Sequence, residues 1–369
     1  MRRRTGAAAA GAAVLLALSA PQAYAAPRHG IQRVSTTVAG AQSATASDGG
    51  GISADGHYAV YGTGGPGDGC PADWSWCVFV KDLRTGKAVQ VPGTGVETHT
   101  LMISGDGTEV GYTTGHYHYF RATVHDRRTG ASWTLWPANP PKDGWYERSD
   151  LTGLSADGRY AAYTIGNRDG DGGALHLLVR DLTTGTDTLA DPVGDPGDIT
   201  GGRLSADGRY VASGTRKAED TALYVTDRTT GRTRRLDTPA GGASSLVDIS
   251  ADGHHVLFNF RTSRPGSAAR AYLADTRTGR AVPVGPAGST ALSADATDRY
   301  VLLADAGGAL YLLDARTGHR HPVAGASAAA TAVPGSVTRD GRSVVFTSAA
   351  ALVPDDTNGV TDVFARRLG

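Results

Sequence analysis

The chain has 369 residues, and its 36 lysine and arginine side chains balance its 36 aspartate and glutamate side chains. A chain without excess positive charge lacks the basic surface that nucleic acid or anionic lipid requires, so we expect neither as a partner. Beyond the first 25 residues no stretch approaches the roughly 18 uninterrupted apolar residues of a spanning helix, so the mature chain should have no membrane span.

The N-terminus has the pattern of a secretory signal peptide. Three arginines follow Met1, an apolar run covers residues 12–18, and residues 23–25 read Ala-Tyr-Ala, as at a cleavage site. We predict a signal peptide over residues 1–25, one domain over residues 26–369, and a protein that is secreted or held in the cell envelope. A disordered N-terminus is the alternative.

A single predicted strand, residues 31–36, precedes a series of repeats. From residue 50 onward the motif Ser-Ala-Asp-Gly recurs, and a short β-type run such as Tyr-Ala-Val-Tyr follows. Successive copies are 43–51 residues apart. Their aspartates, two of them in degenerate copies, are Asp55, Asp106, Asp157, Asp207, Asp252, Asp295 and Asp340.

A second motif follows each of the first six copies: an apolar run that ends in aspartate, then Thr-Gly two or three residues later. Its aspartates are Asp82, Asp126, Asp181, Asp227, Asp275 and Asp314. Both motifs predict hairpin turns, because aspartate accepts backbone N–H bonds and glycine adopts the left-handed conformation. We therefore assign these aspartates to turns and not to a ring of functional carboxylates.

Two hairpins in 40–50 residues are the content of one propeller blade. We predict an all-β, seven-bladed β-propeller of four-stranded antiparallel blades, with an open β-solenoid as the alternative. The repeats lie at about 50–93, 100–136, 150–190, 199–237, 245–285, 289–324 and 334–368. The last repeat lacks a fourth strand, so we expect residues 31–36 to pair with residues 363–368 and close the ring, which removes exposed sheet edges.

The repeat, Ser-Ala-Asp-Gly-Arg-Tyr-Val-Ala followed by Leu-Tyr-Val-Thr-Asp and Thr-Gly, resembles the WD40-like (PD40) repeats of TolB-like propellers of bacteria. The resemblance covers nearly all of residues 31–369. It implies a propeller and, by analogy with TolB, a protein-binding role in the cell envelope. The chain departs from TolB in having seven repeats where TolB has six, and alanine where the family motif has proline.

Two cysteines, Cys70 and Cys77, are an even number in a chain predicted to be exported, which favours a disulfide over two free thiols. Two loops carry oxygen ligands at spacings typical of Ca²⁺ sites. Asp169 and Asp171 partly match a calcium loop, and a second set consists of Asp356, Asn358 and Asp362. Both sets are incomplete, so Ca²⁺ binding and ordinary polar loops are alternatives, and we expect no other cofactor.

Four further residues are candidates for ligand binding. Trp74 and Trp76 lie in the loop between the cysteines and would form an aromatic patch if exposed. His116 and His118 share one face of an extended segment and are able to bind metal or stack on a sugar. Ordinary packing is the alternative for all four, and no local signature marks a catalytic residue.

The sequence therefore predicts a non-catalytic binding or scaffolding module in the extracellular or cell-envelope space, with a protein or an envelope glycan as partner. The alternative is a propeller enzyme, of the polysaccharide lyase, hydrolase or lactonase type, with its site at the mouth of the central channel. An enzyme should gather ionisable groups from several blades at one mouth, whereas a binding module should expose an aromatic or apolar patch there.

Overall fold

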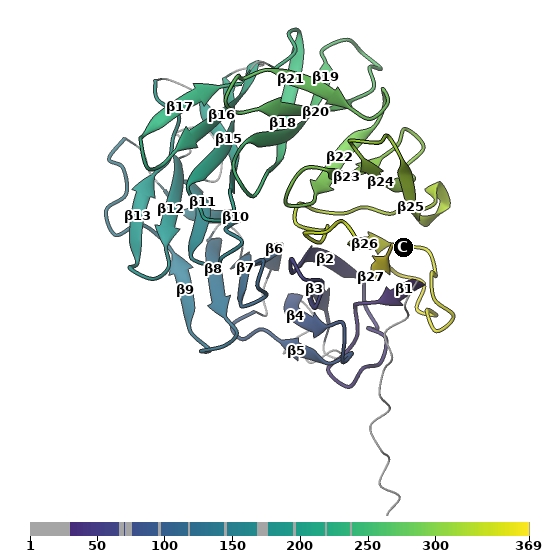
Figure 1. Cartoon of the computed structure of the whole chain (residues 1–369). Helices are drawn as coiled ribbons and strands as arrows, with labels where there is room; N and C mark the ends of the chain where they lie inside the picture. The colour runs from purple at the N-terminus through teal and green to yellow at the C-terminus, as the bar shows by residue number, and fades with distance from the viewer. Residues whose placement is uncertain are drawn as a thin grey trace, which may run out of the picture.

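Seven β-sheets are arranged in a ring, and each four-stranded sheet has its first strand nearest the axis (Figure 1). The computed structural model describes residues 30–65, 70, 76–94, 97–116, 119–143, 146–167, 176–194, 197–217, 220–236 and 238–368. The predicted signal peptide lies outside this part of the chain. The predicted seven-bladed propeller of antiparallel blades is confirmed. No helix among the described residues is long and apolar enough to cross a membrane.

Six blades have four strands each, in chain order from the axis outward. Blade 1 contains β2 (Ser47–Ile52), β3 (Tyr58–Gly64), β4 (Trp76–Asp82) and β5 (Ala88–Gln90), and blade 2 contains β6 (Glu97–Ile103), β7 (Glu109–Gly115), β8 (Arg121–Asp126) and β9 (Ser132–Leu135). Blade 3 contains β10 (Arg148–Leu154), β11 (Tyr160–Gly166), β12 (His176–Asp181) and β13 (Thr186–Leu189), and blade 4 contains β14 (Asp198–Leu204), β15 (Tyr210–Lys217), β16 (Asp220–Asp227) and β17 (Arg232–Arg235). Blade 5 contains β18 (Gly242–Ile249), β19 (His255–Thr262), β20 (Arg270–Asp275) and β21 (Ala281–Val284), and blade 6 contains β22 (Thr290–Ala294), β23 (Tyr300–Ala304), β24 (Leu310–Asp314) and β25 (Arg320–Ala324).

The Ser-Ala-Asp-Gly segment forms the turn between the first two strands of a blade. In blade 1, Ser53 Oγ donates to Asp55 Oδ1 at 2.6 Å and accepts from the Tyr58 backbone N–H at 2.9 Å. The glycine is required twice over: Gly107 of blade 2 has a φ of +76°, and a Cβ there would lie 2.6 Å from the ring of Tyr58. The turn motif therefore also sets the spacing of adjacent blades.

In blade 6 this turn is shifted by two residues from the alignment predicted above, in which Asp295 matched the turn aspartates of the other copies. Asp295 takes the serine position, because its Oδ1 accepts the Tyr300 N–H at 2.7 Å. Asp298 then takes the glycine position, with a φ of +54°. The alignment was wrong because aspartate is able to replace serine as the acceptor in this turn.

The N-terminal strand closes the ring as predicted. Blade 7 contains β26 (Ser343–Ser348) and β27 (Asp362–Arg367), and β1 (Gly30–Arg33) pairs antiparallel with β27. The innermost segment of blade 7 forms isolated bridges to β26, at Thr331 and Val337, where we expected a regular first hairpin. Blade 7 is thus built from both ends of the described chain.

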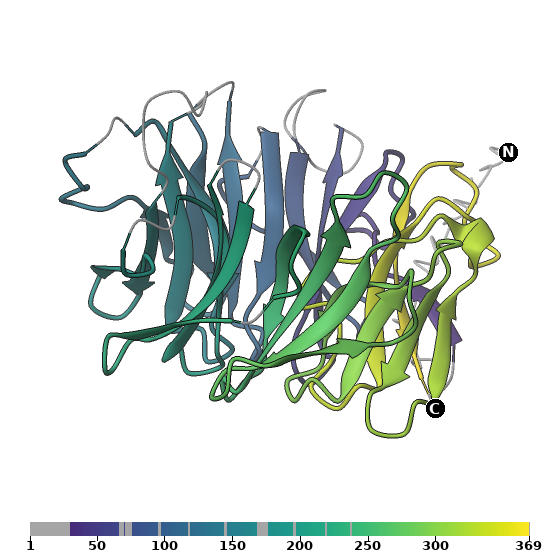
Figure 2. The ribbon, with the colours of Figure 1, turned by 90° about the horizontal axis from the view of Figure 1, so that it is seen from above.

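The strands run between two faces of the ring (Figure 2). We call the face with the Ser-Ala-Asp-Gly and Asp…Thr-Gly turns the turn face. The opposite face, which we call the loop face, carries the connections between the second and third strands and between consecutive blades. Because the turns repeat and the loops do not, the loop face varies most from blade to blade.

Candidate functional site

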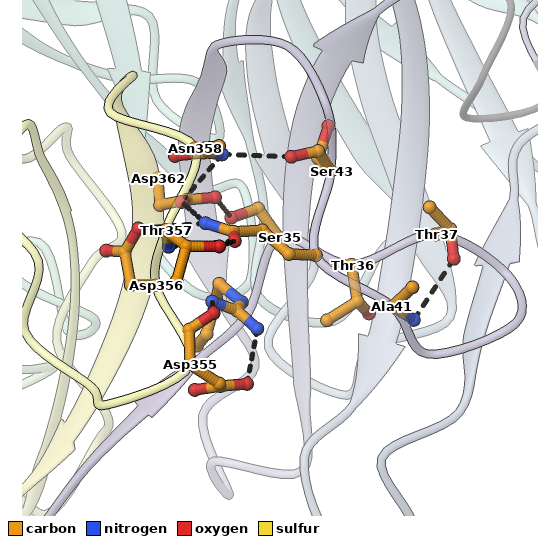
Figure 3. A network of polar contacts seen from close by, with 12 residues as sticks. Ser35, Thr36, Thr37, Ala41, Ser43, Asp355, Asp356, Thr357, Asn358 and Asp362 are labelled. Carbon is orange, nitrogen blue, oxygen red and sulfur yellow. Dashed lines mark hydrogen bonds and ion pairs between the residues drawn. The ribbon is translucent and has the colours of Figure 1, made fainter.

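The second candidate Ca²⁺ set lies where the ring closes (Figure 3). Asp362 is fully buried and accepts hydrogen bonds from Ser35 Oγ at 2.5 Å and from Gln42 Nε2 at 2.9 Å. Asn358 Nδ2 donates to Asp362 Oδ2 at 3.2 Å and to the Ser43 carbonyl at 2.9 Å, and Gln42 Nε2 also donates to Asp356 Oδ1 at 2.8 Å. These contacts, which we call the closure clasp, join the last blade to the N-terminal segment through protein donors.

The other sequence candidates are dispersed. Asp169, Asp171, Trp74 and His118 lie outside the described residues. Trp76 packs over blade 1, since a Cβ on Gly62 would lie 2.2 Å from its Nε1. The structure joins Cys70 to Cys77, with Cα atoms 5.9 Å apart, and the predicted disulfide awaits the chemical test below. His116 is exposed on the loop face, with Nδ1 3.9 Å from Glu97 Oε1.

A ring of equivalent positions surrounds the channel at its loop-face end. The residues in this register are Asp48 in blade 1, His99 in blade 2 and Asp150 in blade 3, with hydroxyl residues Ser245 and Thr290 in blades 5 and 6. Each is at least partly exposed although it lies on an innermost strand and follows a buried residue. Three adjacent blades therefore each carry an ionisable group at this level of the channel.

His99 and Asp150 form a cluster with two neighbouring residues, Phe120 and Arg148, and we call these four residues the mouth cluster. Arg148 donates two hydrogen bonds of 2.6 Å to the Asp150 carboxylate, and His99 Nε2 lies 3.5 Å from Asp150 Oδ1. The Phe120 ring packs edge-on against His99, with centroids 5.1 Å apart, and Arg148 lies 5.3 Å from the same ring. The cluster thus combines an apolar ring with fixed charges.

The electrostatics of the mouth cluster keep Asp150 ionised. Burial alone would raise the pKa of Asp150, but the hydrogen bonds and charges of His99 and Arg148 outweigh it and hold the pKa below its ordinary value. Burial raises the pKa of Asp48 in the neighbouring blade. The backbone beside His99 is strained, because Thr100, in the β-bulge of β6, has a φ of +57°.

Aromatic side chains border the mouth cluster on the loops of blades 2 and 3. Tyr119 is 66% exposed, and Phe120 is half-buried. The Arg121 guanidinium stacks 4.3 Å from the Trp136 ring and donates to the Glu147 carbonyl at 2.5 Å. This stacking ties the loop that follows β7 to the long connection between blades 2 and 3.

A second polar cluster lies further out on blade 3. His176 Nδ1 faces Asp191 Oδ2 at 2.5 Å, and its Nε2 faces Asp143 Oδ1 at 3.2 Å. Tyr146 donates to Asp143 at 2.6 Å, which lowers the pKa of Asp143, while burial and the same bond raise the pKa of Tyr146. This imidazole bridges two carboxylates and fixes the blade 2–3 connection to blade 3.

Deeper in the channel, a hollow of about 90 Å³ is lined by inner-strand residues of several blades. Arg203 reaches into it and donates Nε to the Val247 carbonyl at 3.0 Å. Burial raises the pKa of Asp248, on the same wall, to about 6, although the charge of Arg203 opposes the shift. This constriction is too small for anything beyond a few waters.

Chemically, the mouth cluster presents charges that are already paired, and the exposed ring of Tyr119 lies beside it. Among the described residues, no three His, Cys, Asp or Glu side chains are grouped so that they would hold a metal ion. None of the mouth cluster residues was predicted from the sequence. The only available signal was that His99 and Asp150 differ from the residues at the same register in other blades.

The structure defines the chain as a seven-bladed β-propeller with a polar and aromatic loop face. No protein-family model and no curated protein matches its sequence. Among solved structures, it is similar to an oligogalacturonate lyase in complex with manganese, at 15% identity and a TM-score of 0.63, over 92% of this chain and 97% of that one.

Two further similarities show the breadth of the fold. An oligogalacturonate lyase from Vibrio parahaemolyticus matches at 14% identity and a TM-score of 0.63, over 92% and 93% of the two chains. TolB from Acinetobacter baumannii matches at 19% identity and a TM-score of 0.50, over 72% of this chain and 63% of that one. The TolB resemblance predicted from the repeats is thereby confirmed at the level of fold, which is all that such identities establish.

Proposed function

We propose that the protein is a non-catalytic binding or scaffolding module outside the cytoplasmic membrane, and that its loop face over blades 2 and 3 binds a cell-envelope glycan. The observation that carries the proposal is the exposed Tyr119 next to Phe120 and the mouth cluster, on loops that no other blade repeats. TolB proteins among the structural neighbours support a location in the envelope.

The composition of this surface suits a sugar ligand. The faces of aromatic rings offer flat apolar area for the C–H face of a pyranose ring, and neighbouring fixed polar groups supply hydrogen bonds to hydroxyls. The Arg148–Asp150 pair is bonded before any ligand arrives, so its geometry is preorganised. The pair also engages the carboxylate of Asp150 beside His99, which favours binding over catalysis.

Co-sedimentation with purified cell-wall sacculi tests this proposal. We expect Tyr119→Ala to weaken binding roughly fivefold, the loss typical of one aromatic contact. Leu189→Ala, which removes an apolar side chain that is 57% exposed on the outer strand of blade 3, is the matched control and should bind as the wild type does. Equal binding by Tyr119→Ala and wild type would refute the placement of the site.

A lyase acting on an acidic polysaccharide is the second candidate. It is supported by the two oligogalacturonate lyases that share the fold over most of the chain, and by the three blades that bring Asp48, His99 and Asp150 to the mouth. A lyase assay distinguishes the two candidate functions: the protein is incubated with oligogalacturonate, and the ultraviolet absorbance of unsaturated products is measured. Turnover that disappears in His99→Ala would replace the binding proposal, whereas no turnover supports it.

A further inference from the structure

Blade 7 reverses a charge that the other six blades keep. The residue opposite the first residue of the second strand is Asp82, Asp126, Asp181, Asp227, Asp275 or Asp314 in blades 1–6. In blade 7 this position is Arg367, opposite Ser343. An arginine therefore stands on the turn face where the repeat otherwise has a turn aspartate.

This reversal removes the partner of a second arginine. In blades 3, 4 and 6 the aspartate accepts an ion pair from the arginine that follows the turn. These pairs are Arg159–Asp181 at 2.7 Å, Arg209–Asp227 at 2.8 Å and Arg299–Asp314 at 2.9 Å. Arg342 is the corresponding arginine of blade 7. Among the described residues its side chain pairs only with Asp340, at 3.7 Å, and both side chains of this pair are more than half exposed.

A third cation is added at the turn itself. The Arg339 backbone N–H donates to the Ala54 carbonyl of the next blade, as the Ala251 N–H does to Ala296. Arg339 therefore occupies the position that is alanine in most other turns. The side chains of Arg339 and Arg367 are exposed, and neither forms a hydrogen bond or ion pair with the described residues.

The three arginines line one hollow. A groove of about 780 Å³ between blades 6 and 7 is bordered by Arg339, Arg342 and Arg367, together with Arg299 and His321. Its two carboxylates already serve the turns. Asp340 accepts from Thr338 Oγ1 and the Arg342 N–H, and Asp295 accepts from Thr297 and Tyr300. A smaller hollow of about 280 Å³ shares Arg342 and Arg367 and extends to β1.

We propose that this arginine groove binds an oxyanion, the carboxylate or phosphate group of an acidic ligand, between Arg342, Arg367 and Arg339. Guanidinium groups bind such oxyanions through charge-assisted, often bidentate hydrogen bonds. Three neighbouring cations with one exposed counter-charge are unfavourable until an anion neutralises them. Because the groove lies on the turn face, it is separate from the loop-face site, and the smaller hollow that shares Arg342 and Arg367 extends to the seam where β1 closes the ring.

Binding to dextrans that share one backbone tests the proposal. Wild-type protein at low ionic strength should bind carboxymethyl-dextran and dextran phosphate, and should not bind neutral dextran. Arg367→Asp restores the aspartate of the other blades and gives Arg342 its usual partner, so this variant should fold normally. We expect it to bind both charged dextrans about tenfold more weakly, the loss of at least one charge-assisted contact.

Arg316→Asp is the matched control, because it makes the same charge change at an exposed turn of blade 6 outside the groove. Its affinity should stay within about twofold of wild type. Competition with inorganic phosphate identifies the kind of ligand. If the groove binds a free ion, millimolar phosphate should displace the charged dextrans. If the groove requires the sugar chain as well, phosphate should not displace them. Equal losses in the two variants, or no binding of charged dextran, would overturn the proposal.

Discussion

The blade 6 turn offers the sharpest test of stability, because Asp298 combines two unfavourable features. It adopts a left-handed conformation where the turns of the other blades have glycine. Its side chain is only 3% exposed, and neither carboxyl oxygen has a hydrogen-bond partner among the described residues. Asp298→Gly removes both features and restores the turn of the other blades.

The size of the effect follows from these two features. A non-glycine residue in the left-handed region costs about 1 kcal/mol, and an unpaired buried polar group costs about 1–3 kcal/mol. We therefore expect Asp298→Gly to raise the free energy of unfolding by about 2–4 kcal/mol at pH 7. With an unfolding entropy of about 2.1 cal/mol/K per residue, the melting temperature of a domain of this size should rise by roughly 3–6 °C.

The charge part of this effect depends on pH. Burial, with the charges of Asp248, Asp295 and Asp252, raises the pKa of Asp298 well above 3.8 in the folded state. The folded protein then keeps a proton that the unfolded chain has lost. The stability contributed by this proton is complete below the unfolded pKa and is lost as the pH rises through the folded pKa. As the pH rises, the free energy of unfolding of the wild type should therefore fall relative to that of a variant whose residue 298 cannot ionise.

Asp298→Asn separates charge from strain, because asparagine tolerates the left-handed conformation but carries no charge. Urea unfolding at a series of pH values gives the free energy of unfolding of each protein. The advantage of Asp298→Asn over wild type should grow as the pH rises above the ordinary aspartate pKa of about 4 and through the raised pKa of the folded state. The reasoning fails if Asp298→Gly is no more stable than wild type at pH 7, or if the Asn variant and wild type differ equally at every pH.

Three further stability predictions concern the closure and the cysteines. Asp362→Ala breaks the closure clasp and should lower the free energy of unfolding, measured in urea, by about 3 kcal/mol. Asp198→Ala, an exposed control, should change this free energy by less than about 0.5 kcal/mol. Similar losses of stability in the two variants would argue against the clasp. Reductant should lower the free energy of unfolding of the wild type by about 2 kcal/mol and should not change that of the double variant Cys70→Ser/Cys77→Ser. Free thiols detected in the wild type by mass spectrometry would contradict the disulfide. Lys81 donates to the N-terminal segment, and burial lowers its pKa to about 8. Because the folded state loses this proton before the unfolded chain does, the free energy of unfolding of the wild type should rise between about pH 8 and pH 10. Lys81→Met should abolish that rise, and the same pH dependence in the variant would refute the assignment to Lys81.

The repeats predicted the fold because their turn chemistry is local. A Ser-Ala-Asp-Gly turn needs only residues within six positions, and its recurrence gave seven blades and an unpaired strand for closure. Blade 6 was misaligned because Asp295 accepts the same N–H as a serine does. Local chemistry therefore locates elements more reliably than it aligns degenerate copies.

The candidate sites were less predictable because they depend on contacts distant in the sequence. His99 and Asp150 are 51 residues apart and meet only because adjacent blades share a register. The carboxylates of the closure clasp have the spacing of a calcium loop, but their donors, Ser35 and Gln42, come from more than 300 residues away. Spacing alone does not distinguish an ion from a distant N–H or O–H donor.

Hydrogen exchange of the protein with and without soluble sacculus fragments tests the central proposal, the loop-face site, most directly. We predict that bound fragments slow amide exchange in residues 119–136 and 146–151 and leave the turn face of blade 4 unchanged. Protection confined to other blades, or none at saturating fragment concentration, would contradict a glycan site over blades 2 and 3.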